Sequence, residues 1–232
     1  MKYSLWGFIC ISLLFLAGCR IIQPVEVQSG HYYINQEIQF STIGKVAVLE
    51  LENQSTRSEQ SELMTQSLAD SMGKKHIFSV KCIYRSDPVW QSLQLDSVSE
   101  DDYEQLEEIR KQLGVDAVVF GTIRRYQSYP NFMTHLRLKM ISLRDGKMAW
   151  AMEEVWDSAD KKTTQRMQQY FKDYMRQGYN PINWQIIITS PRAFSRFVSY
   201  EAAQTLPVVM TGPVEHSGAS DNVGLFSGIL MK

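Results

Sequence analysis

A hydrophobic run between Leu113 and Ile123 predicts the central strand of the fold. Gly114 follows a helical pattern, and glycine commonly ends a helix at this position. The apolar run from Val115 onward contains few polar residues, which is typical of a strand buried on both faces. The other regular segments are therefore expected to pack around this strand.

Upstream of the central strand, predicted strands and helices alternate. Apolar runs at 45–53 and 77–84 predict two strands, and a helical pattern at 58–72 lies between them. A second helix is expected at 103–113. The preceding Ser-Glu-Asp-Asp sequence at 99–102 supplies an N-cap and places acids at the positive end of the helix dipole.

Downstream, Asp145-Gly146 separates apolar-patterned runs at 134–143 and 148–156, which is a strong signal for a β-hairpin. Apolar and charged residues alternate in the first run, so one face of the hairpin should be covered and the other solvated. Helices are expected at 163–177 and after Ser190-Pro191, an N-cap followed by proline. The predicted fold class is α/β (α+β), a mixed β-sheet with helices packed on it and two extra C-terminal helices.

The N-terminus has the pattern of a secretory leader. Lys2 is followed by an apolar run at 5–15, which is too short to span a membrane but suits a signal peptide. The run ends in Leu16-Ala17-Gly18-Cys19, which resembles a bacterial lipobox. The resemblance implies that residues 1–18 are a signal peptide, with Leu16, Ala17 and Gly18 in the cleavage motif. It also implies that Cys19 carries a covalent diacylglycerol and an N-acyl chain, and we expect no other cofactor.

The rest of the chain divides into three parts. Residues 19–43 are expected to form a membrane tether with one edge strand at about 32–40, and residues 44–206 a single periplasmic domain. After residue 207 the composition turns to Gly, Ser and Pro, which predicts a flexible tail at 207–232. Arg20 stands where lipoproteins kept in the inner membrane typically carry Asp, so the resemblance favours the outer membrane.

Composition and charge exclude several classes of function. The formal net charge of -1 offers no basic surface for nucleic acid, so nucleic acid is not an expected partner. Once Cys10 is removed with the leader and Cys19 is acylated, Cys82 is left without a disulfide partner. We expect Cys82 to be a buried structural thiol. The histidines show no metal-ligand spacing, so no metal site is predicted; they are His31, His76, His135 and His216.

The remaining candidates for chemistry are weak. The acids between Glu100 and Glu108 have the spacing of a solvated helix face, and Asp116 is expected to cap a local turn. A loop that contains Tyr126, Tyr129, Pro130 and Phe132 follows the central strand. Its aromatic residues could bind a partner or cap one end of the core, and capping is the favoured interpretation. No catalytic residue is identified.

The succession of elements resembles a known group of proteins. Val46-Ala47-Val48-Leu49, the segment from Leu113 to Gly121, and the hairpin with Asp145-Gly146 and Trp150 resemble the anticodon-binding-domain-like α/β fold of bacterial envelope lipoproteins. That group includes the curli secretion channel subunit, the activator lipoprotein of a penicillin-binding protein, and the N-terminal domain of the Tol translocation protein. The resemblance covers about 45–157 and implies a fold and a setting, but no catalytic residues. The helices at 163–206 depart from the members compared.

These observations together predict a non-enzymatic outer-membrane lipoprotein whose domain lies in the periplasm. It is expected to act as an assembly or scaffold factor. Its expected partners are the membrane, which it contacts through the lipid anchor, and either envelope proteins or further copies of itself. A subunit of a curli-type secretion ring or pore and an activator of a peptidoglycan synthase are the alternatives. The pore is disfavoured because the connections at 127–133 and 157–162 are too short for membrane-spanning hairpins.

The lipobox assignment predicts that Cys19→Ala abolishes labelling with a radioactive fatty acid and releases the protein from membranes. The thiol is the group that accepts the lipid, and alanine has none. Continued labelling of the variant would contradict the assignment.

Overall fold

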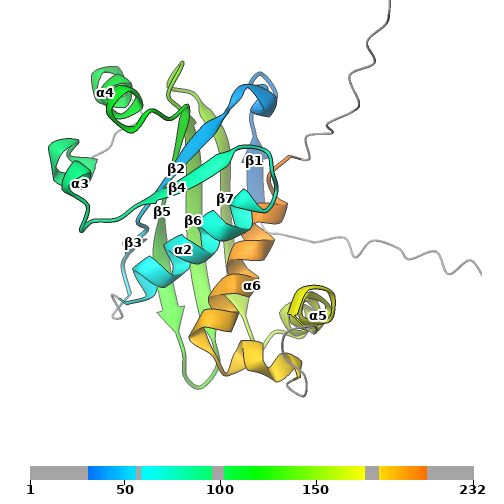
Figure 1. The fold of residues 1–232 in the computed structure, drawn as a ribbon. Coiled ribbons are helices and arrows are strands. Elements are labelled where there is room, and N and C mark those ends of the chain that lie inside the picture. The colour runs from blue at the N-terminus through cyan, green and yellow to red at the C-terminus, as the bar shows by residue number, and fades with distance from the viewer. Residues whose placement is uncertain (1–30, 56–58, 96–101, 176–182, 208–232) are drawn as a thin grey trace, which may run out of the picture.

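The computed structural model describes residues 31–55, 59–95, 102–175 and 183–207 (Figure 1). The predicted signal peptide, the lipid attachment residue Cys19, His216 and the predicted tail at 208–232 lie outside the described residues.

A seven-stranded mixed sheet forms the centre of the domain, and β5 (Ala117–Gln127) is its central strand. The strand order is β1-β7-β6-β5-β2-β4, and β3 also pairs with β5. The parallel pairs β2–β5, β3–β5 and β2–β4 join β5 to strands that precede it in the chain. The pairs β5–β6, β6–β7 and β7–β1 are antiparallel. The predicted fold class is therefore confirmed. The other strands are β1 (His31–Ile34), β2 (Lys45–Leu49), β3 (Glu52–Asn53), β4 (Ser79–Ile83), β6 (Met133–Ser142) and β7 (Met148–Asp157).

The first predicted strand, at 45–53, is divided into β2 and β3. The break lies at Leu51, whose backbone N–H donates to Thr65 Oγ1 at 3.0 Å, while the Ser61 hydroxyl donates to the Leu51 carbonyl oxygen. Both hydroxyls belong to helix α2 (Gln60–Gly73). The two hydroxyl groups bond to the Leu51 backbone where a neighbouring strand would otherwise do so, and the hydrogen-bond ladder of the sheet is interrupted at Leu51.

Helices α2 and α6 (Pro191–Gln204) cover one face of the sheet (Figure 1). As predicted, α6 begins after Ser190, whose hydroxyl accepts from Ala193 N at 3.3 Å, with Pro191 at its first position. Its apolar stripe is fully buried in the larger of two hydrophobic cores, together with Val48 and Val119 of the sheet; the stripe consists of Phe194, Phe197, Val198 and Ala202.

Helices α3 (Pro88–Ser92) and α4 (Tyr103–Leu113) lie on the opposite face. They bury a smaller core with Val118 and Leu49 of the sheet. The helix predicted at 103–113 is confirmed: Asp102 caps it by accepting from Gln105 N, and Gly114 ends it at φ 61°, in the left-handed region. Helix α3 has no counterpart among the predicted elements, which leave the stretch between 84 and 103 unassigned.

Three further elements differ from the prediction. The helix expected at 163–177 is α5 (Lys161–Tyr170), which continues as a π-helical turn (Phe171–Met175). A 3-10 helix (Trp184–Ile188) precedes α6. The edge strand expected at 32–40 is shorter: β1 ends at Ile34, and a 3-10 turn (Phe40–Thr42) follows. Residues 31–43, assigned to the tether in the sequence analysis, pack against the sheet, since Phe40 and Ile43 are buried.

A buried polar network fastens α5 and α6 to β7. Glu201 of α6 is 3% exposed, and its Oε2 accepts from Trp156 Nε1 at 3.1 Å and lies 3.0 Å from Arg166 Nε. Arg166 of α5 also donates through Nη2 to Glu154 Oε1 at 2.9 Å. Burial raises the pKa of Glu201 to about 7, although Arg166 and Trp156 oppose the shift.

Gly121 is a close-contact position in the sheet. A Cβ atom at residue 121 would lie 2.2 Å from the Arg137 carbonyl oxygen and 2.7 Å from Leu138 Cδ2. We predict that Gly121→Val lowers the free energy of unfolding by about 3 kcal/mol, since the backbone of β6 must move to admit the side chain. Gly73→Ala is the control, because its Cβ would meet nothing within 4 Å. Equal urea midpoints for both variants would contradict this packing.

Glu201 predicts a pH dependence of stability. A carboxyl whose pKa is raised on folding binds more protons in the folded state, so stability falls as pH rises from about 4.5 to about 7. Glu201→Gln should reduce the pH dependence of the urea unfolding midpoint over this range, because the amide does not titrate. Parallel pH profiles for the wild type and the variant in urea denaturation would show that Glu201 does not carry the dependence.

Candidate protein-binding face

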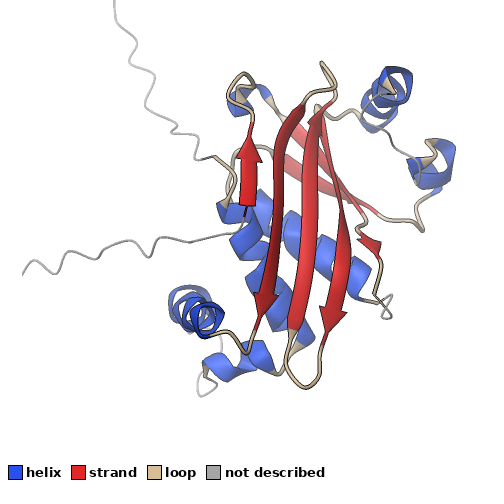
Figure 2. Ribbon diagram, turned by 180° about the vertical axis from the view of Figure 1, so that it is seen from behind, coloured by secondary structure: helices blue, strands red, loops and turns tan. Residues whose placement is uncertain are grey.

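Much of one sheet face is left uncovered by the described helices. Helices α3 and α4 cover only the end nearest β2, and the long strands β5, β6 and β7 are visible beyond them (Figure 2). Side chains alternate along these strands, and every second one points away from α2 and α6. We call this surface the open face; it consists of Phe120, Thr122, Arg124 and Arg125 on β5, His135, Arg137 and Lys139 on β6, and Ala151, Glu153 and Val155 on β7.

Glu153 lies at the centre of a charge cluster on the open face. Its Oε1 is 2.8 Å from His135 Nε2 and 3.9 Å from Arg124 Nε, and its Oε2 is 3.8 Å from Arg137 Nε. A register shift between Ile123 and Arg125 brings Arg124 to this position. The open face thus has four Arg and Lys side chains and one acid, whereas the whole chain has a net charge of -1.

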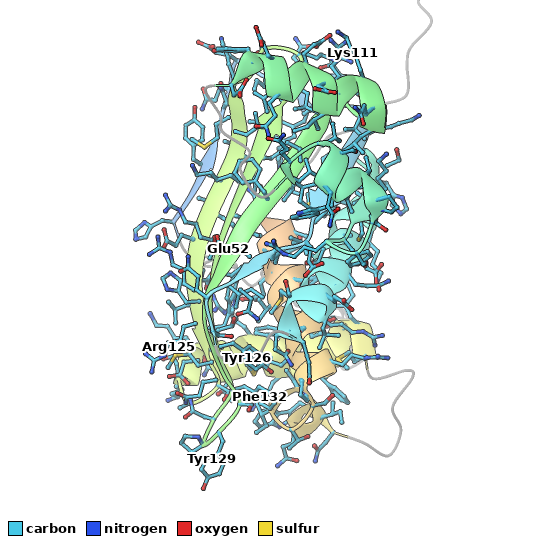
Figure 3. The ribbon with its side chains drawn as sticks, turned by 90° about the vertical axis from the view of Figure 1, so that its left-hand side faces the viewer. Glu52, Lys111, Arg125, Tyr126, Tyr129 and Phe132 are labelled. Carbon is cyan, nitrogen blue, oxygen red and sulfur yellow. The ribbon has the colours of Figure 1, made fainter. Side chains whose placement is uncertain are left out.

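Arg125 extends the cationic surface toward the far end of β5. It pairs with His135 across the strands, and its side chain is exposed. Figure 3 shows Arg125 on the side of the sheet away from α2 and α6, while Tyr126 points toward these helices. The cationic side chains therefore follow the strands over most of the open face.

A hollow of about 460 Å³ lies where the open face meets α3. Trp90, Leu95 and Phe120 supply apolar lining, and Trp90 is 3% exposed. Arg137 and Lys139 of β6 and the acids Glu50 and Glu52 also line the hollow. The Arg85 guanidinium lies 4.8 Å from the centre of the Trp90 ring, and the Trp90 indole Nε1 has no hydrogen-bond partner in the described part of the chain.

The structure separates the three aromatic residues of the candidate loop. Tyr126 and Phe132 are buried at 7% and 5% exposure and meet edge to face with ring centres 6.4 Å apart. Phe132 also lies 5.2 Å from Phe194 of α6. Tyr129 is 85% exposed at the tip of the loop (Figure 3). Of these three aromatic residues, Tyr129 is therefore the one that a partner can reach.

Asp116 has a different role from the predicted one. Its Oδ2 accepts from the backbone N–H groups of Gly44 at 2.9 Å and Lys45 at 3.0 Å, and Arg144 Nη2 donates to its Oδ1 at 3.0 Å. Partial burial alone would raise its pKa, but these backbone and guanidinium donors lower it. The prediction of a local turn cap is wrong, because Asp116 joins segments that are distant in the sequence.

The other polar candidates have structural surroundings. Cys82 is half-buried in β4, and burial raises the pKa of its thiol. The described acids of α4 lie on its solvent side, where Glu107 contacts Arg110 and Lys111. Within the described ranges no three His, Cys, Asp or Glu side chains are close enough to hold a metal ion. No helix among the same residues has the length and apolar character needed to cross a membrane.

The sequence indicated only part of the open face. The alternation of Leu136, Arg137, Leu138 and Lys139 predicted a solvated face on this hairpin. The approach of Glu153 to Arg124 and Arg137 depends on strand register and on the irregularity in β5. The hollow depends on α3, which was not predicted.

No protein-family model matches the chain, and no curated protein matches it. Three solved structures illustrate its structural similarities. PelC from Paraburkholderia phytofirmans, a dodecamer, is 11% identical with a TM-score of 0.40, over 58% of this chain and 86% of the PelC chain. Lipoprotein GNA1162 from Neisseria meningitidis is 13% identical with a TM-score of 0.39, over 58% and 98% of the two chains. The LpoB C-terminal domain from Salmonella enterica is 14% identical with a TM-score of 0.35, over 49% and 83%.

The similarity to these structures concerns the fold alone. At such identities and TM-scores, the activity and partners of this chain have to be argued from its own residues.

Proposed function

We propose that this protein is a non-enzymatic lipoprotein of the cell envelope that binds another envelope protein through the open face. In this proposal, acyl chains on Cys19 hold it at the outer membrane, and the domain lies in the periplasm. The observation that carries the proposal is the open face itself, a sheet surface that the described helices leave uncovered and on which arginine side chains gather around Glu153.

Two features of the open face, its rigid base and the adjoining hollow, are those of a binding surface rather than of a sheet face that only contacts solvent. Long antiparallel strands support it, and α2 and α6 pack against their other side, so its side chains are held on a rigid base. The adjoining hollow gives access to apolar residues at the edge of a buried core. Interfaces commonly combine such an apolar pocket with a polar rim.

The connections around the hairpin bear on the pore alternative. Residues 128–132 join β5 to β6, and residues 158–160 join β7 to α5. A membrane-spanning strand takes about 9 to 11 residues, so neither connection holds a spanning hairpin. An adaptor or scaffold role is therefore the better proposal, whether the bound protein is a different envelope protein or a second copy.

Photo-crosslinking in cells tests this function. A photoreactive amino acid replaces Val155, which is 49% exposed on β7 and lies opposite His135 of the open face, in the full-length lipidated protein. We expect a discrete adduct with an envelope protein, because the partner would cover this position. Glu108, exposed on α4, is the matched control position. Equal adducts from both positions, or none from position 155, would contradict the proposal.

A further inference from the structure

We propose that the bound partner presents an extended acidic peptide, which uses one carboxylate and one neighbouring apolar side chain. The carboxylate would take the place of Glu153 among Arg124, His135 and Arg137, and the apolar side chain would enter the hollow beside Trp90 and Phe120. This inference rests on the proposed function and specifies the chemistry of its partner.

The first support is the geometry around Glu153, where the two neighbouring arginine Nε atoms do not hydrogen-bond to its carboxylate. His135 is within hydrogen-bond distance of the carboxylate, but both arginine Nε atoms stand 3.8 to 3.9 Å away. A charge-assisted N–H···O bond is about 2.7–2.9 Å long, so neither Nε makes one with Glu153. A guanidinium has five N–H donors, and both arginine side chains are 45% exposed. The cluster can therefore accept a second carboxylate in place of Glu153.

The second support is that the anion site and the hollow share a residue. Arg137 contacts Glu153 and also lines the hollow. Lys139 lies two residues further along β6 and lines the hollow as well. A ligand held by Arg137 is thus already at the entrance to the apolar lining formed by Trp90, Leu95 and Phe120.

The third support is the spacing of the nitrogen-bearing side chains along β6. His135, Arg137 and Lys139 occupy alternate positions of one strand, which places them about 6.5–7 Å apart. The side chains of an extended peptide that point to one side repeat at the same spacing. A peptide lying along β6 would therefore bring alternate side chains over His135, Arg137 and Lys139 in turn.

The hollow favours a peptide side chain over a stacked sugar ring. A stacked ligand needs an exposed aromatic face, but the Trp90 ring is buried and the Arg85 guanidinium lies 4.8 Å from its centre. The hollow is therefore a recess of mixed lining, in which Trp90, Leu95 and Phe120 are accompanied by charged side chains, rather than a flat stacking surface.

If Glu153 occupies the position of the ligand carboxylate, it competes with the ligand. Its removal should strengthen binding of an acidic peptide, because Arg124 and Arg137 lose their internal counter-charge and His135 loses its hydrogen-bond partner. This gain distinguishes the proposed anion site from a face that is merely basic.

The test measures fluorescence anisotropy of a short fluorescein-labelled peptide in which glutamate and leucine take turns along one side of the extended chain, with serine at each position between them. The protein is the mature chain with Cys19→Ala, which lacks only the lipid. We expect Glu153→Gln to tighten binding about threefold and Arg137→Glu to weaken it about tenfold. Glu108→Gln on α4 and Lys172→Glu on the π-helical turn are the matched controls, since both residues are exposed outside the open face.

Three results would overturn the inference. The first is unchanged or weaker binding by Glu153→Gln, and the second is equal weakening by Arg137→Glu and Lys172→Glu. The third is binding of polygalacturonate, but not of the peptide, to the open face. Lys139→Gln replaces Arg137→Glu if the latter fails to unfold cooperatively. A peptide with serine in place of leucine should bind more weakly, and equal binding would remove the hollow from the site.

The two proposals can fail separately. An adduct from position 155 in cells together with no response to Glu153→Gln would leave the open face as the interface and reject the acidic peptide. No adduct from position 155 would reject the proposed function itself.

Discussion

The fold depends on the two-sided burial of the first part of β5. Ala117 and Val119 face the core under α2 and α6, and Val118 faces the core under α3 and α4. All three are fully buried, and each partner strand in the middle of the sheet is placed by its register with β5. Phe120, the next residue on the side of Val118, lines the hollow, and the open face begins there. Stability and the candidate interface are thus set by the same strand.

The features that the sequence predicts correctly are those set by residues close to them in the chain. Asp102 and Gly114 delimit α4, Ser190 and Pro191 start α6, and Asp145-Gly146 marks the hairpin; each of these signals acts within a few residues. The unpredicted features depend on distant residues. The break between β2 and β3 requires hydroxyl groups from α2, and Asp116 binds backbone groups that precede it by more than 70 residues.

The candidate site follows the same division. Alternation along β6 predicted which hairpin face would be solvated, because that depends only on strand periodicity. The cluster around Glu153 requires β7 to lie beside β6 in one register and β5 to be irregular near Arg124. Composition alone does not predict which aromatic residues of the loop are exposed. Tyr126 and Phe132 lie in the core, and Tyr129 lies on the surface. The role assigned to Cys19 comes from the lipobox pattern in the sequence.

The central claim is that the open face is covered by another protein in the cell. The most direct measurement is the rate at which N-ethylmaleimide labels Val155→Cys in a Cys82→Ser background, compared between intact cells and the purified protein. The account predicts much slower labelling in cells at position 155 and unchanged labelling of Glu108→Cys. Equal rates at position 155 in both settings would contradict it.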